Sequence, residues 1–289
     1  MTNLTGRVAL VTGAARGQGR SHAVALAQAG ADIVGLDACQ DVDSIPYPLA
    51  KPYDLDETGK LVQAEGRQFL GRECDVRSSQ SLYEAVQLAR ESFGRIDILV
   101  ANAGIWGLGV LWELTDAQWQ DMIDVNLTGV WRTLKAVLPT MIEARRGSVI
   151  LTASVNGLEG GPGYAHYVAA KHGVVGLMRN AALELGPFGV RCNAVCPGFI
   201  DTAMNDWQGA YDMMAGAPGG TPEDRRVGAY NWSALAGQGM LPASAISEAV
   251  VWLASDSSAR ITGVTLPVDS GHMVLPGSNG NPVLEVPRP

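Results

Sequence analysis

A tyrosine, a lysine and a serine have the types and spacing for acid–base chemistry. Tyr167 and Lys171 stand four residues apart in Y-V-A-A-K, and Ser154 ends an apolar run thirteen positions upstream. Residues four apart on a helix share a face, so the phenol and the ammonium would lie side by side. To act as a base near neutral pH, the phenol must lower its pKa from about 10 by roughly 3 units, or about 4 kcal/mol. A cation about 4 Å away supplies that energy at an effective dielectric constant of about 20, and the serine hydroxyl could hold the substrate oxygen.

The same spacing also arises on amphipathic helices that carry no chemistry, so the pair needs support from the rest of the chain. Two histidines flank it, but His166 and His172 fall off the face that carries Tyr167 and Lys171. We therefore expect both imidazoles on the helix surface.

Composition restricts the classes of function. The chain has 289 residues, 47% hydrophobic content and a formal charge of -8, which disfavours a nucleic-acid or anionic-membrane partner. The N-terminus lacks the pattern of a leader and no apolar run approaches eighteen residues, so we expect a soluble, cytoplasmic protein acting on small molecules. The four cysteines show no C-x-x-C spacing, which predicts reduced core residues and no metal site.

Apolar strands alternate with helical stretches along almost the whole chain. This pattern predicts one α/β domain, residues 1–289, with a seven-stranded parallel sheet and helices on both faces. The predicted strands begin at Arg7, Ala31, Gln68, Ile96, Gly147, Val190 and Val264. Helical periodicity covers residues 18–29, 79–92, 116–143, 163–185 and 244–254.

Three segments depart from this rhythm. Residues 38–67 form a proline-containing insert in which at most residues 56–65 read as helical. Residues 200–242 interleave glycines with large apolar side chains, which favours a lid over an apolar substrate. Residues 275–289 lack periodicity, so this tail would cover a neighbouring subunit or stay mobile.

A glycine-rich turn after the first strand predicts a dinucleotide site. Gly13, Gly17 and Gly19 stand between a strand and a helix, where glycines let a pyrophosphate approach the helix N-terminus. Asp37 ends the second strand, where a carboxylate would bind a ribose 2′-hydroxyl and repel a 2′-phosphate, which favours NAD over NADP. Arg16 could welcome such a phosphate, but we interpret it as a partner of Asp37 or a wall of the adenine pocket.

Over essentially its whole length the chain resembles the short-chain dehydrogenase/reductase family, which implies a single-domain Rossmann fold. The motifs appear in order: T-G-x-x-x-G-x-G from Thr12, D-V at Asp75 and Val76, N-A-G with alanine in place of its first asparagine, and N-x-x-x-P-G from Asn193. The resemblance implies a catalytic set of Asn126, Ser154, Tyr167 and Lys171. It also implies cofactor contacts from Gly13, Arg16, Gly17, Gln18, Gly19, Asp37, Asp75, Val76, Asn102, Ala103, Gly104, Tyr167, Lys171, Pro197, Gly198, Ile200 and Thr202.

A narrower resemblance is to the mycofactocin-coupled, carveol-dehydrogenase-like branch. This resemblance rests on three features: the start G-A-A-R-G-Q-G-R-S-H, with Gln18 between glycines, the D-A-C after the second strand, and the insert. It implies a tightly held NAD that is reoxidised in place by a peptide-derived redox carrier, with the insert covering the cofactor. Alternatively, the insert is a surface segment that has no role in cofactor binding.

The family resemblance implies alcohol oxidation in which Tyr167 is the base, Ser154 holds the oxygen and Lys171 lowers the tyrosine pKa and binds the ribose. Asn126 would hold a water that returns the proton to solvent. Alternatively, Ser154 merely caps a turn and Asn126 satisfies buried backbone. We expect the substrate pocket to be lined by Trp106, Val155, Leu158, Tyr164, Phe199, Met204 and Trp207, whose lack of charge favours a terpenoid or ring alcohol, carveol-like, and its ketone.

Three other classes compete with this interpretation. A carrier-bound 3-oxoacyl reductase would want NADP and a basic patch, and a nucleotide-sugar epimerase would show different glycine spacing. A non-catalytic NAD-binding scaffold would lack a member of the catalytic set. The resemblance also implies a homotetramer, and apolar residues of the long helices, including Trp131, Val174 and Val175, are expected partly at subunit contacts.

Overall fold

The computed structural model describes residues 3–285, which form one seven-stranded sheet in which all neighbouring strands are parallel. The strand order β3-β2-β1-β4-β5-β6-β7 is that of a doubly wound Rossmann fold. Each predicted strand is present within two residues. The strands are β1 (Val8–Thr12), β2 (Asp32–Asp37), β3 (Phe69–Glu73), β4 (Ile98–Ala101), β5 (Gly147–Thr152), β6 (Val190–Pro197) and β7 (Thr265–Val268).

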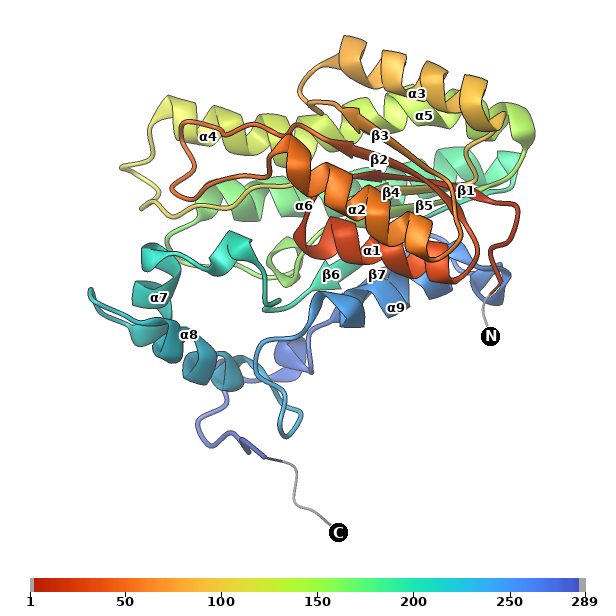
Figure 1. Cartoon of the computed structure of the whole chain (residues 1–289). Coiled ribbons are helices and arrows are strands. Elements are labelled where there is room, and N and C mark those ends of the chain that lie inside the picture. The colour runs from red at the N-terminus through yellow and green to blue at the C-terminus, as the bar shows by residue number, and fades with distance from the viewer. Residues whose placement is uncertain (1–2, 286–289) are drawn as a thin grey trace.

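Helices cover both faces of the sheet (Figure 1). One layer contains α1 (Gly17–Gln28), α2 (Pro52–Ala64) and α9 (Ala243–Ala254); the other contains α3 (Ser79–Phe93), α5 (Gly129–Ala144) and α6 (Ala165–Leu185). The central strands β1 and β4 are buried along their entire length, which is why they read as continuous apolar runs.

The stretch predicted as one helix over 116–143 is interrupted. It consists of α4 (Asp116–Ile123), a π-helical turn (Asp124–Thr128) and α5. The backbone stays helical at both junctions, so the extra residue widens one turn without breaking the axis. Such turns are frequent at functional sites, and this one contains Asn126.

The insert contains a longer helix than its sequence pattern predicts. Helix α2 begins at Pro52, because proline suits the first helical position, where no backbone donor is needed. The Asp54 carboxylate accepts a hydrogen bond from the backbone N–H of Lys51 (2.9 Å) and closes this end of the helix. Before the helix, residues 38–51 extend as the red-orange loop that reaches toward α4 in Figure 1.

The segment 200–242 contains α7 (Gln208–Ala215) and α8 (Pro222–Gly228), which project below the sheet (Figure 1). The Arg225 guanidinium, nearly buried, joins α8 to Asp201 (3.0 Å) and to the side chain of Asn205 (3.0 Å). The described part of the tail lies on this segment of its own chain, because Asn279 donates to the Asn231 carbonyl (2.7 Å) and Gly237 to the Val283 carbonyl. Residues 275–285 thus contact their own chain, the suggestion that the tail covers a neighbouring subunit or is mobile stays a prediction, and residues 286–289 lie outside the described part.

Some sequence-based expectations about burial were wrong. His166 is 2% exposed, and Val174 and Val175 lie in the hydrophobic core, because α6 is buried against β6 and α4 over much of its circumference. His172 is on the surface as expected, and all four cysteines are buried free thiols. Residues 3–285 contain no cluster of metal-ligating side chains and no helix long and apolar enough to span a membrane.

Candidate active site

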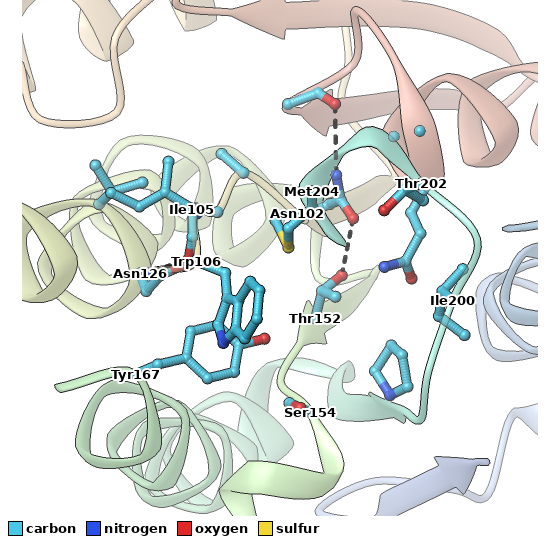
Figure 2. Close-up of a pocket in the computed structure, with 18 of the residues that line it drawn as sticks. Asn102, Ile105, Trp106, Asn126, Thr152, Ser154, Tyr167, Ile200, Thr202 and Met204 are labelled. Carbon is cyan, nitrogen blue, oxygen red and sulfur yellow. Dashed lines mark hydrogen bonds between the residues drawn. The ribbon is translucent and has the colours of Figure 1, made fainter. Parts of the chain in front are cut away.

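One cavity of about 250 Å³ lies at the carboxyl ends of the strands, where ligands bind in doubly wound sheets. The loops after β1 to β6, the insert and the segment 200–242 all contribute to its lining. Figure 2 labels Asn102, Thr152, Ser154 and Tyr167 among the side chains that line this cavity.

The turn after β1 forms a cradle that only glycine permits. A Cβ atom on Gly19 would lie 1.9 Å from the Gly13 carbonyl oxygen, and one on Gly13 would lie 2.8 Å from the Ala103 Cα. Gly13 and Gly17 also have positive φ angles (+67° and +54°). The Oε1 atom of Gln18, in the same lining, is buried without a hydrogen-bond partner. The cradle, the N-terminus of α1 and this free acceptor fit a dinucleotide with its polar groups.

Asp37 is fixed at the end of β2. One carboxylate oxygen accepts from the Ala15 backbone N–H (3.0 Å) and the other from the Cys39 N–H (3.0 Å). Arg16 lines the cavity but makes no ion pair with Asp37 within residues 3–285, so its interpretation as the partner of Asp37 was wrong. Asp37 thus lines the cavity with no ion-pair partner among the residues that the structure describes.

The loop after β4 is tied to its neighbours through Asn102. Its amide nitrogen donates to the Thr12 carbonyl (3.1 Å), its backbone N–H donates to the Thr12 hydroxyl (3.0 Å), and its amide oxygen faces the Thr152 hydroxyl (3.4 Å), as Figure 2 shows. These contacts connect β1, β4 and β5 at the cavity floor. The other predicted cofactor residues also line this cavity: Asp75, Val76, Ala103, Gly104, Pro197, Gly198, Ile200 and Thr202.

Tyr167 and Lys171 lie on the same face of α6 and both line the cavity. The Lys171 ammonium lies 5.5 Å from the centre of the Tyr167 ring. It donates to the Thr152 carbonyl (2.9 Å) and is only 3% exposed. An ammonium has three donors, so two remain available for other groups in the cavity.

Burial dominates the electrostatics of this pair. Burial raises the pKa of Tyr167 to about 12, against a smaller lowering by the Ser154 hydroxyl, and burial lowers the pKa of Lys171 to about 8. The expected fall of the tyrosine pKa is therefore absent in the protein alone, because desolvation outweighs the neighbouring groups. A cationic ligand in the cavity would oppose this effect.

The position of Ser154 bears out its interpretation as a cap, and its role toward a substrate stays a prediction. Its hydroxyl accepts from the backbone N–H of Asn156 (3.2 Å) and so caps the short 3-10 turn Val155–Gly157. The same side chain lines the cavity beside Tyr167. The cap orients the hydroxyl and does not use its proton, which points to the Tyr167 phenol in the protein alone.

Asn126 is fully buried in the π-helical turn. Its Oδ1 accepts from the Ile105 N–H (3.1 Å) and its Nδ2 donates to the Ile105 carbonyl (2.9 Å). Both amide atoms thus hold the loop after β4, which is the structural alternative that the sequence left open. This contact keeps Ile105 and Trp106 against the cavity (Figure 2).

Five of the seven predicted substrate residues line the cavity: Trp106, Val155, Tyr164, Phe199 and Met204. Two do not. Leu158 packs against the hydrophobic core, and Trp207 lies behind Trp106, with ring centres 5.6 Å apart. The two exceptions follow loops whose path is set by tertiary packing, which the sequence pattern does not encode.

Several lining residues were missed. The insert contributes Tyr47, Leu49 and Val42, and the segment 200–242 contributes Met213 and Trp232. Tyr47 is 6% exposed, and its hydroxyl accepts from the Trp106 N–H (3.0 Å). An aromatic residue between two prolines, Pro46 and Pro48, was the available indication that this position is buried.

The cradle, the free carboxylate after β2 and the Ser-Tyr-Lys set in one cavity define a nucleotide-dependent oxidoreductase of the short-chain type. The family model for short chain dehydrogenases matches residues 7–210, and the chain belongs to this family.

Relatives match nearly the whole chain. It is 48% identical over 273 residues to an uncharacterised NAD-dependent oxidoreductase of Mycobacterium tuberculosis, covering 94% of this chain and 97% of the relative. It is 43% identical to (-)-trans-carveol dehydrogenase of Rhodococcus erythropolis, covering 94% and 99%. A crystal structure of carveol dehydrogenase from Mycobacterium avium in complex with NAD matches with a TM-score of 0.92 and 44% identity over 95% of this chain and all of that one.

Proposed function

We propose that the protein is an NAD-dependent dehydrogenase that interconverts a small apolar secondary alcohol, terpenoid or cyclic and carveol-like, with its ketone. The observation that carries this proposal is the position of Ser154, Tyr167 and Lys171 in the same cavity as the glycine cradle. The names of the relatives support the cofactor and the substrate class.

NAD rather than NADP is favoured by Asp37. Its carboxylate can accept hydrogen bonds from both hydroxyls of an adenosine ribose, whereas a 2′-phosphate would meet it at like charge, which costs several kcal/mol. Arg16 does not neutralise this carboxylate. Lys171 has donors left for the hydroxyls of the nicotinamide ribose.

In the oxidation that we propose, Ser154 donates a hydrogen bond to the substrate oxygen and Tyr167 removes its proton. Bound NAD supplies the acceptor of the substrate hydride and a positive charge beside the phenol. Lys171 adds a second positive charge, and the two together lower the tyrosine pKa that burial raises. The proton then leaves along Lys171 and the loop that Asn126 holds, through a water in the role that the family resemblance implies.

The apolar wall of Trp106, Val155, Phe199 and Met204 favours an uncharged substrate. The cations of this lining are Arg16, Arg77 and Lys171, and we assign all three to the dinucleotide, so a phosphate or carboxylate substrate would find no further cation in the lining. A carrier-bound acyl substrate is disfavoured for the same reason.

Tight retention of NAD, and its reoxidation in place by a mycofactocin-type redox carrier, are part of the proposal. Support comes from the insert, whose residues Gln40, Val42, Tyr47 and Leu49 line the cavity together with the cradle. We further propose a cytoplasmic homotetramer, as the family resemblance implies.

Single-turnover spectroscopy tests the function. The purified protein should release NAD on denaturation, and carveol should convert the bound NAD to NADH with a rise in absorbance near 340 nm. Tyr167→Phe should retain NAD and lose this conversion by at least a factor of about 10³. Exposed Tyr53→Phe serves as the matched control.

Two results would contradict the proposal. Turnover retained in Tyr167→Phe would remove the acid–base assignment. Bound NAD without any turnover of an alcohol or ketone panel would indicate a non-catalytic NAD-binding scaffold.

A further inference from the structure

A second cavity, of about 230 Å³, lies beside the active site between the insert and the segment 200–242. The insert contributes Ile45 and Pro46, the loop after β4 contributes Gly107 and Leu108, and Trp207 closes one side. None of the proposed catalytic or cofactor residues lines it, so it is distinct from the active-site cavity.

The lining of this second cavity is suited to an apolar group. Ile45, Leu108, Met122 and Trp207 present hydrocarbon or ring surface. Of the polar side chains in it, Ser44 donates to the Asp121 carboxylate (2.7 Å) and the Gln118 side chain caps the start of α4 at Thr115. His166, which also lines this cavity, has a buried Nδ1 without a hydrogen-bond partner among the described residues. A hydrocarbon chain or ring therefore matches most of this lining, with the His166 imidazole as its polar exception.

Three aromatic rings separate the two cavities. Trp207 packs edge-on against Trp106 (5.6 Å between ring centres) and tilted against Tyr47 (6.0 Å). Trp106 and Tyr47 line the active-site cavity, whereas their chain neighbours Gly107 and Pro46 line the second one. The three rings, which we call the ring partition, thus stand between the substrate oxygen site and the apolar space behind it.

Trp207 is the least constrained member of the ring partition. Tyr47 and Trp106 are joined by a hydrogen bond and are less than 10% exposed. Trp207 is half-buried, and its indole N–H donates to the Met204 carbonyl (3.0 Å) within its own segment. It therefore moves with this segment, and only ring contacts hold it against the other two rings.

We propose that the second cavity is a distal substrate subsite, which receives the alkyl chain or second ring of an extended secondary alcohol when Trp207 is displaced. This inference rests on the proposed function and deepens it, because it assigns a substrate class larger than the active-site cavity alone admits. Gly107 and Trp207 then determine how long a substrate is accepted.

The test compares 4-methylcyclohexanol with 4-pentylcyclohexanol in single-turnover reduction of bound NAD. Trp207→Ala should raise the ratio of pentyl to methyl rate constants by about tenfold, since the ring partition opens.

Variants that fill the second cavity should have the opposite effect. Gly107→Leu should lower that ratio by about tenfold, because a Cβ there meets no atom closer than 3.9 Å and the added side chain fills the second cavity. Leu108→Trp, from a half-buried position in the same lining, repeats the test if Gly107→Leu folds poorly. Trp112→Ala, at an indole that is 83% exposed, should leave the ratio unchanged.

A binding measurement separates this proposal from the proposed function. In the NAD-loaded Tyr167→Phe protein, calorimetry should show 4-pentylcyclohexanol binding up to about 100-fold more tightly than the methyl compound, from four additional buried methylenes. Gly107→Leu or Leu108→Trp should remove most of that difference. A difference that both filling variants leave unchanged overturns the subsite, even where turnover supports the dehydrogenase. Loss of the difference supports the subsite, even where no turnover is seen.

Discussion

At the scale of single residues, burial and nearby positive charge shift the pKa of Tyr167 in opposite directions. Tyr167 needs a low pKa for proton removal, yet its surroundings raise the pKa to about 12 in the protein alone. Positive charge in the cavity would oppose this shift, and the buried Lys171 ammonium is the source nearest the phenol, although burial lowers its own pKa to about 8. In the mechanism that we propose, Tyr167 would therefore become an effective base only when the cofactor adds its positive charge.

Lys171→Met tests this charge balance. Oxidation requires the ionised phenol, so the single-turnover rate should rise with pH until the tyrosine pKa is reached. Removing the ammonium should raise that pKa and move the rising limb at least one pH unit higher, with a rate at pH 7 reduced by about tenfold or more. The pH profile of NADH formation gives the measurement, and exposed Lys60→Met should keep the wild-type limb. A limb that stays in place in Lys171→Met would show that Lys171 only binds the ribose.

Most of the residues that we propose for chemistry line one cavity as expected, because the roles proposed for them require fixed spacing. The four-residue separation of Tyr167 and Lys171 is dictated by the helix, and the spacing of Gly13, Gly17 and Gly19 is dictated by the approach of a phosphate. Tyr47 and Trp207 were not predictable in their positions, since irregular segments follow tertiary contacts instead of a period. His166 was misplaced for the related reason that α6 is buried on more than one face.

At the scale of elements, the strands were the most predictable part of the fold. Buried parallel strands such as β1 and β5 read as continuous apolar runs, and short loops fix their order along the chain. The π-helical turn at Asn126 and the start of α2 at Pro52 escaped prediction, because both are local departures too short for an apolar period to reveal.

The packing of α1 on α9 predicts that the free energy of unfolding decreases at low pH. His22 of α1 is fully buried and its Nδ1 contacts the Ser247 hydroxyl of α9 (2.8 Å), and burial lowers its pKa to about 3. The unfolded chain has a histidine pKa near 6.5, so this contribution is complete above pH 6.5 and is lost as the pH falls toward 3. The free energy of unfolding should fall by about 1.4 kcal/mol per pH unit from this group alone.

His22→Gln provides the comparison, since glutamine cannot take up a proton. Its free energy of unfolding, measured by urea titration between pH 4 and 7, should depend less steeply on pH than that of the wild type. His172→Gln, at a surface position of α6, should keep the wild-type slope. Equal slopes in all three proteins would exclude His22 as the acid-sensitive contact.

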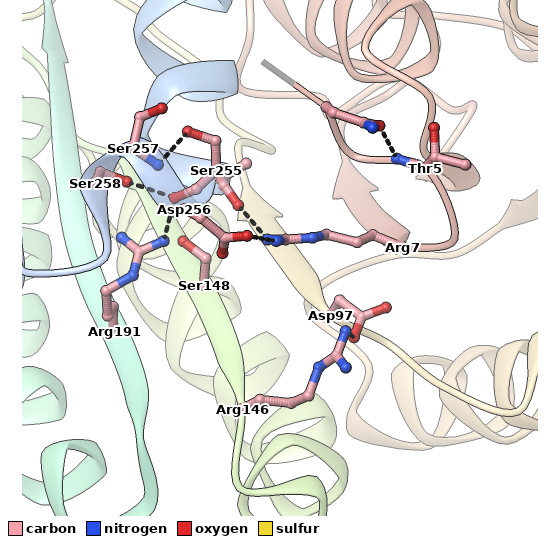
Figure 3. Close-up of polar contacts among 12 residues, drawn as sticks. Thr5, Arg7, Asp97, Arg146, Ser148, Arg191, Ser255, Asp256, Ser257 and Ser258 are labelled. Atoms are coloured by element: carbon pink, nitrogen blue, oxygen red, sulfur yellow. Dashed lines mark hydrogen bonds and ion pairs between the residues drawn. The ribbon is translucent and has the colours of Figure 1, made fainter. Parts of the chain in front are cut away.

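At the scale of the whole molecule, a polar network joins the amino-terminal ends of the central strands, opposite the active site (Figure 3). The Asp97 carboxylate, 5% exposed, accepts from the Val8 N–H (3.0 Å) and pairs with Arg95 (2.6 Å) and Arg146 (2.8 Å). It thereby joins the start of β1 to segments before β4 and β5. The Arg7–Asp256 pair lies nearby, but its carboxylate is 85% exposed.

Removing the buried Asp97 carboxylate should lower the free energy of unfolding more than removing the exposed Asp256 carboxylate. Asp97→Ala leaves a buried backbone donor without its partner and should cost about 3 kcal/mol. Asp256→Ala should cost less than about 1 kcal/mol, because water screens its exposed ion pair. Urea unfolding with unchanged m-values gives both numbers. Equal losses would mean that the network at Asp97 contributes no more than a surface pair.

The largest-scale prediction is the homotetramer. Trp119 of α4, Trp131 of α5 and Leu183 of α6 remain 39%, 45% and 79% exposed, and these helices belong to the same layer of the molecule. Apolar side chains exposed in one layer are stabilised when another copy covers them. Sedimentation equilibrium should therefore give four times the 30.4 kDa of one chain.

Trp131→Glu should shift this assembly toward smaller species, since a buried carboxylate without a partner is costly. Tyr53→Glu on α2, in the other helical layer and 70% exposed, should sediment like the wild type. A wild-type protein that sediments as a monomer would contradict the tetramer, and a Trp131→Glu tetramer would place the contacts on another face.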